Sequence, residues 1–222
     1  SNGYNGTSRG TETYVHNGVT YPRTEGSIDL QQSVHQEIIQ DIRNGWDSNW
    51  KNRGTKMDNF GELRMLYDED PVARLPGILV EIAFHDHPED AAALKNPRFN
   101  QLAARATYQG IVKYFEDQDG RNLTLAPEPP THLRIENIGS GTVRVSWEPS
   151  PTDAIDLGGD AATAYRIYTS TDGFAWGAPV TVIGNHYDIT RLDEGATVYV
   201  RVTAINDGGE SFPTEVLGAR VG

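Results

Sequence analysis

The spacing of apolar residues along the chain predicts a helix near its beginning. Between Leu30 and Ile42 an apolar residue recurs at every fourth position. This spacing places one apolar stripe along a helix, with Ser27 as the N-cap and an end near Trp46.

Short strand-like runs alternate with helical patterns in this first part of the chain. The runs cover residues 11–15, 62–66 and 77–84. The last of them, GILVEIAF, is nearly all apolar, as expected for a strand covered on both faces. A second long helix should start at Asn96, a good N-cap followed by Pro97, and end at Phe115. The alternation predicts an α/β domain over residues 1–116.

The helical period disappears after a proline-rich segment. Residues 117–130 contain an Asp-Gly turn and the run Pro127-Glu-Pro-Pro130, which favours extended backbone and indicates a short, semi-stiff linker. Residues 131–222 instead predict an all-β sandwich. Its expected strands are 132–137, 142–147, 164–170, 180–183 and 197–206.

Composition and charge narrow the possible functions. The 222 residues carry a formal charge of −12 and contain no cysteine. An acidic chain without a basic block is a poor nucleic-acid binder. The lack of cysteine excludes disulfides, thiol nucleophiles and Cys-based zinc sites. No apolar run reaches the roughly 18 residues of a membrane span.

Glu81 is the most informative polar residue, because it interrupts the apolar run 77–84. Strand alternation places it on a face with Leu79, Ala83 and His85. A buried carboxylate needs a partner, since burial without one costs several kcal/mol. That partner could be a metal-bound water or a proton, in a catalytic site. It could also be Arg64 or Arg74, at a purely structural sheet margin.

The residues around Glu81 resemble a known family of hydrolases. The segment LPGILVEIAF, residues 75–84, followed by Pro88-Glu-Asp90 and a helix ending in Tyr114-Phe115, is similar to the closing motif of the zinc-dependent N-acetylmuramoyl-L-alanine amidases. Upstream, Gly10-Thr-Glu-Thr-Tyr14 and Arg53-Gly-Thr-Lys56 resemble two further motifs of that family, in the same order. The sandwich resembles a fibronectin type III module, with Trp147 as its core tryptophan and Tyr199 near its corner.

The resemblance implies a reaction and a role for Glu81. These enzymes cleave the amide between N-acetylmuramic acid and L-alanine in peptidoglycan. In such a mechanism zinc polarises the scissile carbonyl and lowers the pKa of a bound water. Glu81 matches the glutamate that acts as general base on this water and then as acid toward the leaving amine. The implied partner is peptidoglycan, and the implied location is extracytoplasmic, secreted or at the cell wall.

The zinc ligands that the resemblance implies, His, Glu and His, do not align with residues of this chain. The third would stand just before Ser1, so we expect this chain to be the C-terminal half of an amidase domain, with an N-terminal fragment of the same protein as a potential partner. His85 and His87 form a His-x-His pair that could ligate zinc in its place. Asn2, Arg64 and His85 are secondary candidates for substrate contact. Glu12, His16 and His35 have weaker cases as ligands.

Two alternatives stay open at this point. The chain could be a non-catalytic wall-binding or structural fragment, with a degenerate amidase half and an adhesive module. Within the module, Phe174 and Trp176 could form a sugar-stacking surface or pack a sheet edge.

Overall fold

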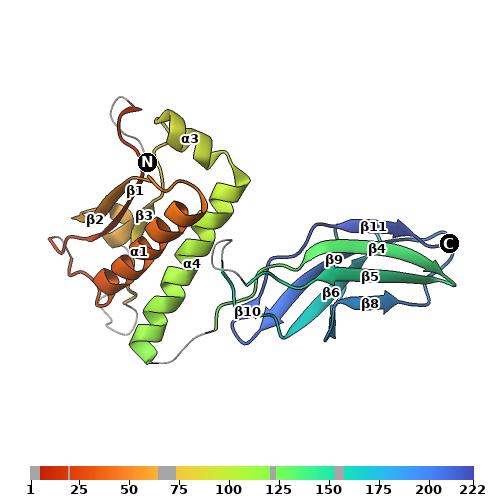
Figure 1. Cartoon of the computed structure of the whole chain (residues 1–222). Coiled ribbons are helices and arrows are strands. Elements are labelled where there is room, and N and C mark those ends of the chain that lie inside the picture. The colour runs from red at the N-terminus through yellow and green to blue at the C-terminus, as the bar shows by residue number, and fades with distance from the viewer. Residues whose placement is uncertain (1–5, 20, 65–73, 121–123, 153–157) are drawn as a thin grey trace. The chain divides into compact units, whose positions relative to one another are not determined.

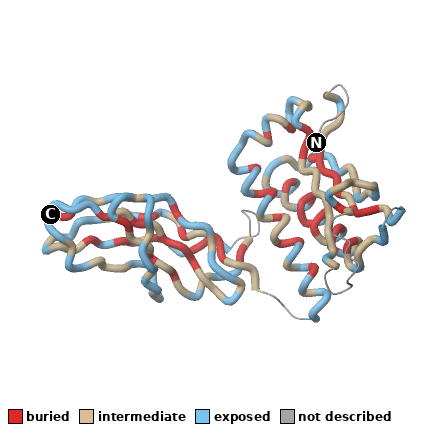
Figure 2. The backbone as a smooth tube through the Cα atoms, turned by 180° about the vertical axis from the view of Figure 1, so that it is seen from behind, coloured by how far each residue is buried: buried red, intermediate tan, exposed pale blue. Residues whose placement is uncertain are grey.

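The computed structural model describes residues 6–19, 21–64, 74–120, 124–152 and 158–222 (Figure 1). The chain divides into two compact units, Ser1–Leu123 and Thr124–Gly222. Each unit has a core of its own, and buried residues run through the interior of each (Figure 2). The predicted α/β domain and the β-sandwich that follows it are therefore two separate compact units.

The first unit is a small mixed sheet covered by helices. The described strands lie in the order β2-β1-β3, with β2 parallel and β3 antiparallel to β1. Helix α1 packs on the sheet and α4 packs against α1 (Figure 1). The elements are β1 (Thr11–His16), α1 (Ser27–Gly45), β2 (Asn52–Asp58), α2 (Gly61–Arg64), β3 (Leu79–Glu81), α3 (Pro88–Leu94) and α4 (Pro97–Asp119).

The apolar stripe predicted for the first helix forms the core between α1 and α4. Val34, Ile38 and Ile42 are fully buried, and Phe99 and Ala106 of α4 are buried with them. Asn96 caps α4 as predicted, since its side chain accepts a hydrogen bond from the backbone N–H of Arg98 at 2.9 Å.

Two local predictions in this unit were wrong. The N-cap of α1 is Gly26, at φ 76°, and the Ser27 hydroxyl instead accepts the N–H of Gly77 at 3.1 Å. Residues 61–64 form a helical turn where a strand was predicted, and residues 65 and 66 lie outside the described residues. Short runs of this kind have no period long enough to separate helix from strand, so tertiary contacts decide.

The strand that carries Glu81 is shorter and less covered than its apolar sequence suggests. β3 has 3 residues, all of intermediate burial. Among the described residues β3 pairs with β1 alone, so it lies at an edge of this sheet. The polar strand β2 and the helix α3 were not anticipated from periodicity, because β2 is mostly exposed and α3 is short.

The second unit is a sandwich of two antiparallel sheets. Its core contains Trp147 from β5 and Ile167 from β6, with three fully buried residues from β9. The strands are β4 (Thr131–Gly139), β5 (Thr142–Glu148), β6 (Ala164–Ser170), β7 (Val180–Val182), β8 (His186–Ile189), β9 (Thr197–Asn206), β10 (Gly209–Glu210) and β11 (Leu217–Arg220). The short strands β8, β10 and β11 were missed by the sequence pattern.

The segment expected as a linker belongs partly to each unit. Helix α4 continues to Asp119 and is closed by Gly120 in the left-handed conformation. From Thr124 onward the chain packs on the sandwich, where the Asn206 side chain donates to the carbonyl of Leu125 at 2.9 Å.

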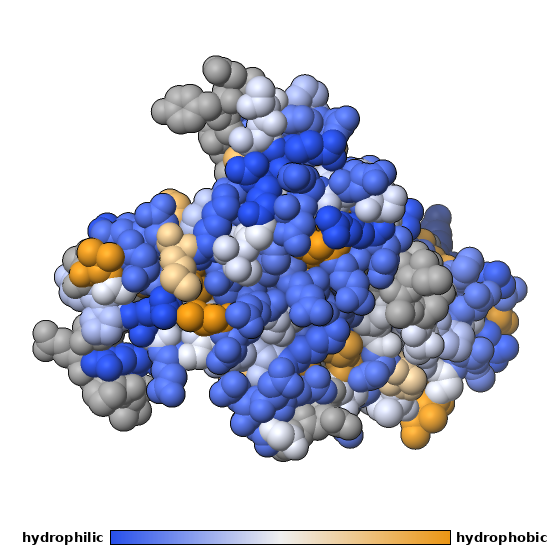
Figure 3. All heavy atoms as spheres, turned by 60° about the vertical axis from the view of Figure 1, so that its left-hand side comes forward, coloured by the Kyte–Doolittle hydropathy of each residue, from blue (hydrophilic) through white to orange (hydrophobic). Residues whose placement is uncertain are grey.

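The face of the molecule seen in Figure 3 is largely hydrophilic. Hydrophobic side chains form small separate groups on it. None of the helices in the described part of the chain has the length and apolar character that a bilayer crossing requires.

Candidate functional site

Glu81 lies directly opposite Glu12 in the sheet. β3 runs antiparallel to β1, and the register pairs Glu81 with Glu12 and Val80 with Thr13. Opposed residues share a face, with Cβ atoms about 4.5–5.5 Å apart. Thr13 contacts His35 of α1, so the two glutamates lie on the other face of the sheet. The alternation predicted for residues 78–84 is thereby confirmed for Val80 and Glu81.

The direction of β3 determines which end of the sheet holds Glu81. β3 is antiparallel to β1, and Glu81 is the last residue of β3. Glu81 therefore lies beside the beginning of β1, next to the segment that leads into Thr11. Within that segment, a Cβ built on Gly6 would be 2.9 Å from the carbonyl oxygen of Asp86, so residues 6–10 follow the turn after β3 closely.

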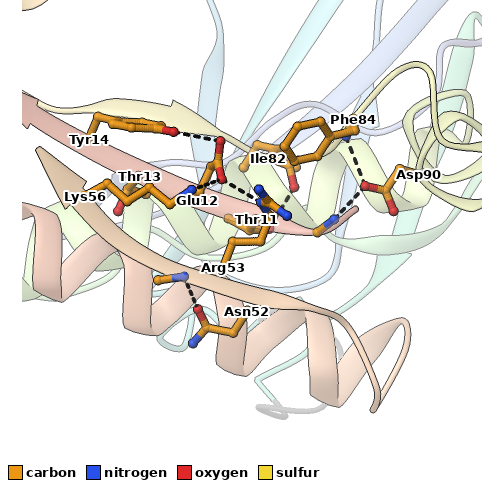
Figure 4. Close-up of polar contacts among 12 residues, drawn as sticks. Thr11, Glu12, Thr13, Tyr14, Asn52, Arg53, Lys56, Ile82, Phe84 and Asp90 are labelled. Atoms are coloured by element: carbon orange, nitrogen blue, oxygen red, sulfur yellow. Dashed lines mark hydrogen bonds and ion pairs between the residues drawn. The ribbon is translucent and has the colours of Figure 1, made fainter. Parts of the chain in front are cut away.

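Glu12 is the centre of a cluster of charged and polar groups (Figure 4). Only 5% of the residue is exposed. One carboxylate oxygen, Oε2, accepts from Arg53 Nε at 2.6 Å and from Lys56 Nζ at 2.5 Å, and the other accepts from the Tyr14 hydroxyl at 2.9 Å. Burial alone would raise the pKa of Glu12, but the hydrogen bonds from Lys56, Arg53 and Tyr14 lower it below its usual value. Glu12 is thus a stable anion that holds two cations near Glu81.

Tyr14 is held in its neutral form by the same cluster. Burial and the hydrogen bond to Glu12 together raise the pKa of the Tyr14 hydroxyl to about 12. The Tyr14 ring contacts Lys56, whose Nζ lies 5.5 Å from the ring centroid, and Phe60 packs edge-on at 5.0 Å.

Asp90 joins the start of β1 to the segment after β3. It is fully buried, and its Oδ2 accepts the N–H groups of Gly10 at 2.7 Å and Phe84 at 3.0 Å. Arg9 is close to Asp90 on the other side and also pairs with Glu89. One carboxylate thus binds the backbone just before β1 and the backbone just after β3. The segment that enters β1 is therefore fixed relative to the segment that follows Glu81.

Thr11 adds a second connection between the same two segments. Its hydroxyl donates to the carbonyl of Ile82 and accepts the indole N–H of Trp50, at 2.7 and 2.8 Å. Thr11 is fully buried and 1% of Trp50 is exposed. These contacts anchor the backbone directly after Glu81 to the beginning of β1.

The predicted secondary site residues do not all meet at this edge. Arg64 donates to Asn59 at 3.4 Å, and its contacts within the described residues do not include Glu81. His85 is exposed at a turn beside the site. Asn2 lies outside the described residues.

His85 and His87 lie in one turn. It is closed by a hydrogen bond from the His87 N–H to the Phe84 carbonyl at 3.1 Å, and His85 lies within the turn whereas the backbone of His87 is extended. The ring of His87 is turned toward Asp90, with Nδ1 3.9 Å from Oδ1.

The described residues do not bring together a ligand set for a metal. Among them, no group of at least 3 His, Cys, Asp or Glu side chains is arranged to hold an ion. The Glu12 carboxylate is already paired with Arg53 and Lys56. His35 lies between Thr13 and Asn52, and His16 contacts Asn59 at 3.0 Å. The part of the chain described here therefore does not fit a complete zinc site.

The aromatic residues of the module are divided between two environments. The Trp176 ring stacks on Arg201, whose Cζ is 4.4 Å from the ring centroid. Phe174 is 89% exposed, on a loop whose backbone N–H groups donate to Asp172. Trp176 thus packs on its own sheet.

Fold and site together define a two-unit protein, in which an α/β unit with a glutamate at a sheet edge precedes a β-sandwich. The sequence profile of the N-acetylmuramoyl-L-alanine amidase family matches residues 1–113, and that of the fibronectin type III domain matches residues 128–220. The chain belongs to the N-acetylmuramoyl-L-alanine amidase family and carries a fibronectin type III domain. Both resemblances seen in the sequence are confirmed.

Parts of this chain are similar to individual relatives and solved structures. A Bacillus anthracis protein described as an uncharacterized cell wall amidase is 30% identical over 127 residues, which are 56% of this chain and 21% of the relative. The structure of an N-acetylmuramoyl-L-alanine amidase from Clostridium difficile 630 matches with 26% identity and a TM-score of 0.43, covering 53% of this chain and 55% of that one. The amidase AmiC2 of Nostoc punctiforme matches with 28% identity and a TM-score of 0.38, over 49% of each chain. The chain thus spans about a fifth of the curated relative and about half of each amidase structure.

Proposed function

We propose that this chain is part of a peptidoglycan hydrolase that cleaves the amide between N-acetylmuramic acid and L-alanine, with Glu81 as its general base and acid. The observation that carries the proposal is the position of Glu81. It lies at a sheet edge, half-buried, within the family-matched residues, and opposite the charged cluster around Glu12.

The role follows from what a carboxylate can do there. Glu81 takes a proton from the water that attacks the scissile carbonyl carbon. It then delivers this proton to the amine nitrogen as the carbon–nitrogen bond breaks, leaving a carboxylic acid and an amine. Proton transfer requires that donor and acceptor stay within hydrogen-bond reach of each other. The hydrogen bonds of Asp90 and Thr11 meet this requirement, because they limit the movement of the strand β3 that carries Glu81.

Zinc belongs to the proposal for the parent protein. When bound, it would polarise the carbonyl and activate water. The part of the chain that the structure describes does not supply a complete set of ligands for it.

The test is Glu81→Gln in the full-length protein, with Glu62→Gln as a matched control. Glu62 is exposed on α2, so its amide should leave muropeptide release unchanged. Glu81→Gln should reduce kcat by about a hundredfold or more, since general acid–base catalysis typically contributes that much. Activity near wild type in Glu81→Gln would refute the assignment. Chelation that leaves release unchanged would refute the zinc dependence.

The second candidate is a non-catalytic wall-binding or structural fragment. The incomplete ligand set of the described residues favours it. It predicts binding to purified peptidoglycan without release of muropeptides and without bound zinc. Both candidates place the protein outside the cytoplasm, with peptidoglycan as its partner. An N-terminal fragment of the same protein remains a proposed second partner.

A further inference from the structure

Arg53 of β2 is held rigidly on two sides. Its Nε donates to Glu12 Oε2 at 2.6 Å, and its guanidinium carbon lies 4.8 Å from the centroid of the Phe84 ring. Figure 4 shows the guanidinium between the Glu12 carboxylate and that ring. Phe84 is 3% exposed and Glu12 is 5% exposed, so both supports belong to the packed interior. An arginine fixed in this way has already lost most of its side-chain freedom.

The outer part of the Arg53 guanidinium is still available. Glu12 engages only Nε, and the terminal nitrogens make no hydrogen bond to any residue that the structure describes. The Arg53 side chain is 27% exposed. Its remaining N–H groups therefore form a planar fork at the surface, the arrangement that binds a carboxylate through two parallel hydrogen bonds.

Arg53 keeps donors that the neighbouring carboxylate does not use. Arg53 and Lys56 share the single carboxylate of Glu12, and the formal positive charge left on these three residues is balanced by Glu81 opposite Glu12. Lys56 is satisfied by Glu12 and by the Tyr14 ring, whereas Arg53 has donors to spare. Glu81 is the next carboxylate, directly across the strand pair from Glu12, so an anion on Arg53 would be bound close to the reacting amide.

We propose that Arg53 is a specificity-determining residue that binds a free carboxylate in the peptide part of the substrate. The inference rests on the proposed amidase function. On the glycan side of the scissile amide the substrate offers hydroxyl and acetamide groups, whereas the peptide side carries carboxylates. A fixed guanidinium beside Glu81 thus selects the acidic peptide and orients the L-alanine amide toward the glutamate.

The experiment compares two substrates that differ at one group, N-acetylmuramoyl-L-alanyl-D-glutamine, whose α-carboxylate is free (the acid), and its α-amide, which has no carboxylate in the peptide (the amide). The full-length protein should cleave the acid with a kcat/KM about tenfold or more above that of the amide, since a charge-assisted bidentate contact is worth about that factor. Arg53→Gln should raise KM for the acid about tenfold and change KM for the amide by less than about twofold. Arg53→Lys, which keeps the charge without the fork, should fall between.

Arg144→Gln is the matched control, because Arg144 also makes a two-point contact with a carboxylate, that of Asp188 in the module. Arg144→Gln should leave KM and kcat/KM unchanged for both substrates. Equal effects of Arg53→Gln on acid and amide would overturn the inference, as would a wild type that does not distinguish them.

A calorimetric titration with the same two compounds separates this inference from the proposed function. If neither compound is cleaved, the amidase proposal fails. A tighter affinity for the acid that Arg53→Gln removes would still support the carboxylate site, and equal affinities would overturn it.

Discussion

Glu12 and Glu81 face each other across the antiparallel pair of β1 and β3, so two carboxylates share one face of a small sheet. Such a pair is tolerated because Arg53 and Lys56 neutralise Glu12 from the neighbouring strand. The consequence is a division of roles. Glu12 is buried and saturated with donors, which makes it structural, whereas Glu81 is half-buried at the strand end.

Glu12→Gln should destabilise the first unit in a pH-dependent way. At pH 7 we expect a loss of about 2 kcal/mol, because the amide leaves Arg53 and Lys56 without their anion. The folded-state pKa of Glu12 is lowered, so its contribution is present above the unfolded value of 4.5 and is lost as the pH falls through the folded pKa. Urea unfolding followed by helical circular dichroism at pH 7 and pH 3 measures this. A difference from wild type that is the same at both pH values would contradict it.

Asp41→Asn should stabilise the same unit at neutral pH. Burial and the nearby Glu37 together raise the pKa of Asp41 to about 6. The folded state therefore favours the protonated acid, and wild-type stability rises as the pH falls from above 6 toward the unfolded value of 3.8. The asparagine avoids the charged form and should gain on the order of 1 kcal/mol at pH 7. The gain should shrink toward pH 4. Asp117→Asn, at an exposed position of α4, is the control and should show neither effect.

Gly110→Ala tests the contact between α1 and α4. A Cβ at Gly110 would lie 2.5 Å from the Cα of Val34, and the Gly110 carbonyl accepts the Ser33 hydroxyl at 2.7 Å. Alanine favours an isolated helix by about 1 kcal/mol, but here it must separate two helix backbones. We expect a net loss of about 1–3 kcal/mol, measured by thermal unfolding. Gly61→Ala is the control, since its nearest neighbour is the flexible end of Arg64 at 3.4 Å. An unchanged melting temperature in Gly110→Ala would refute the close contact.

Local sequence signals predicted the elements that have a long, regular pattern. The apolar stripe from Leu30 to Ile42 predicted α1, and the pair Asn96-Pro97 predicted the start of α4. The strands around Trp147 followed from their alternation. Ser27 failed as a cap because its hydroxyl serves Gly77, a residue 50 positions away. The strands β8, β10 and β11 were missed because they are short. Their strand conformation depends on pairing with β5 or β9 and not on a pattern of their own.

The sequence by itself determined the two-part organisation, the family and the choice of Glu81, because these depend on periodicity and on motifs of consecutive residues. Tertiary structure alone decided what surrounds Glu81. Arg53 reaches Glu12 across 41 positions and Asp90 reaches Gly10 across 80, and such contacts exist only after the strands have paired. The direction of β3 was likewise decided by its pairing with β1, since a run of apolar residues carries no information about its neighbour's direction.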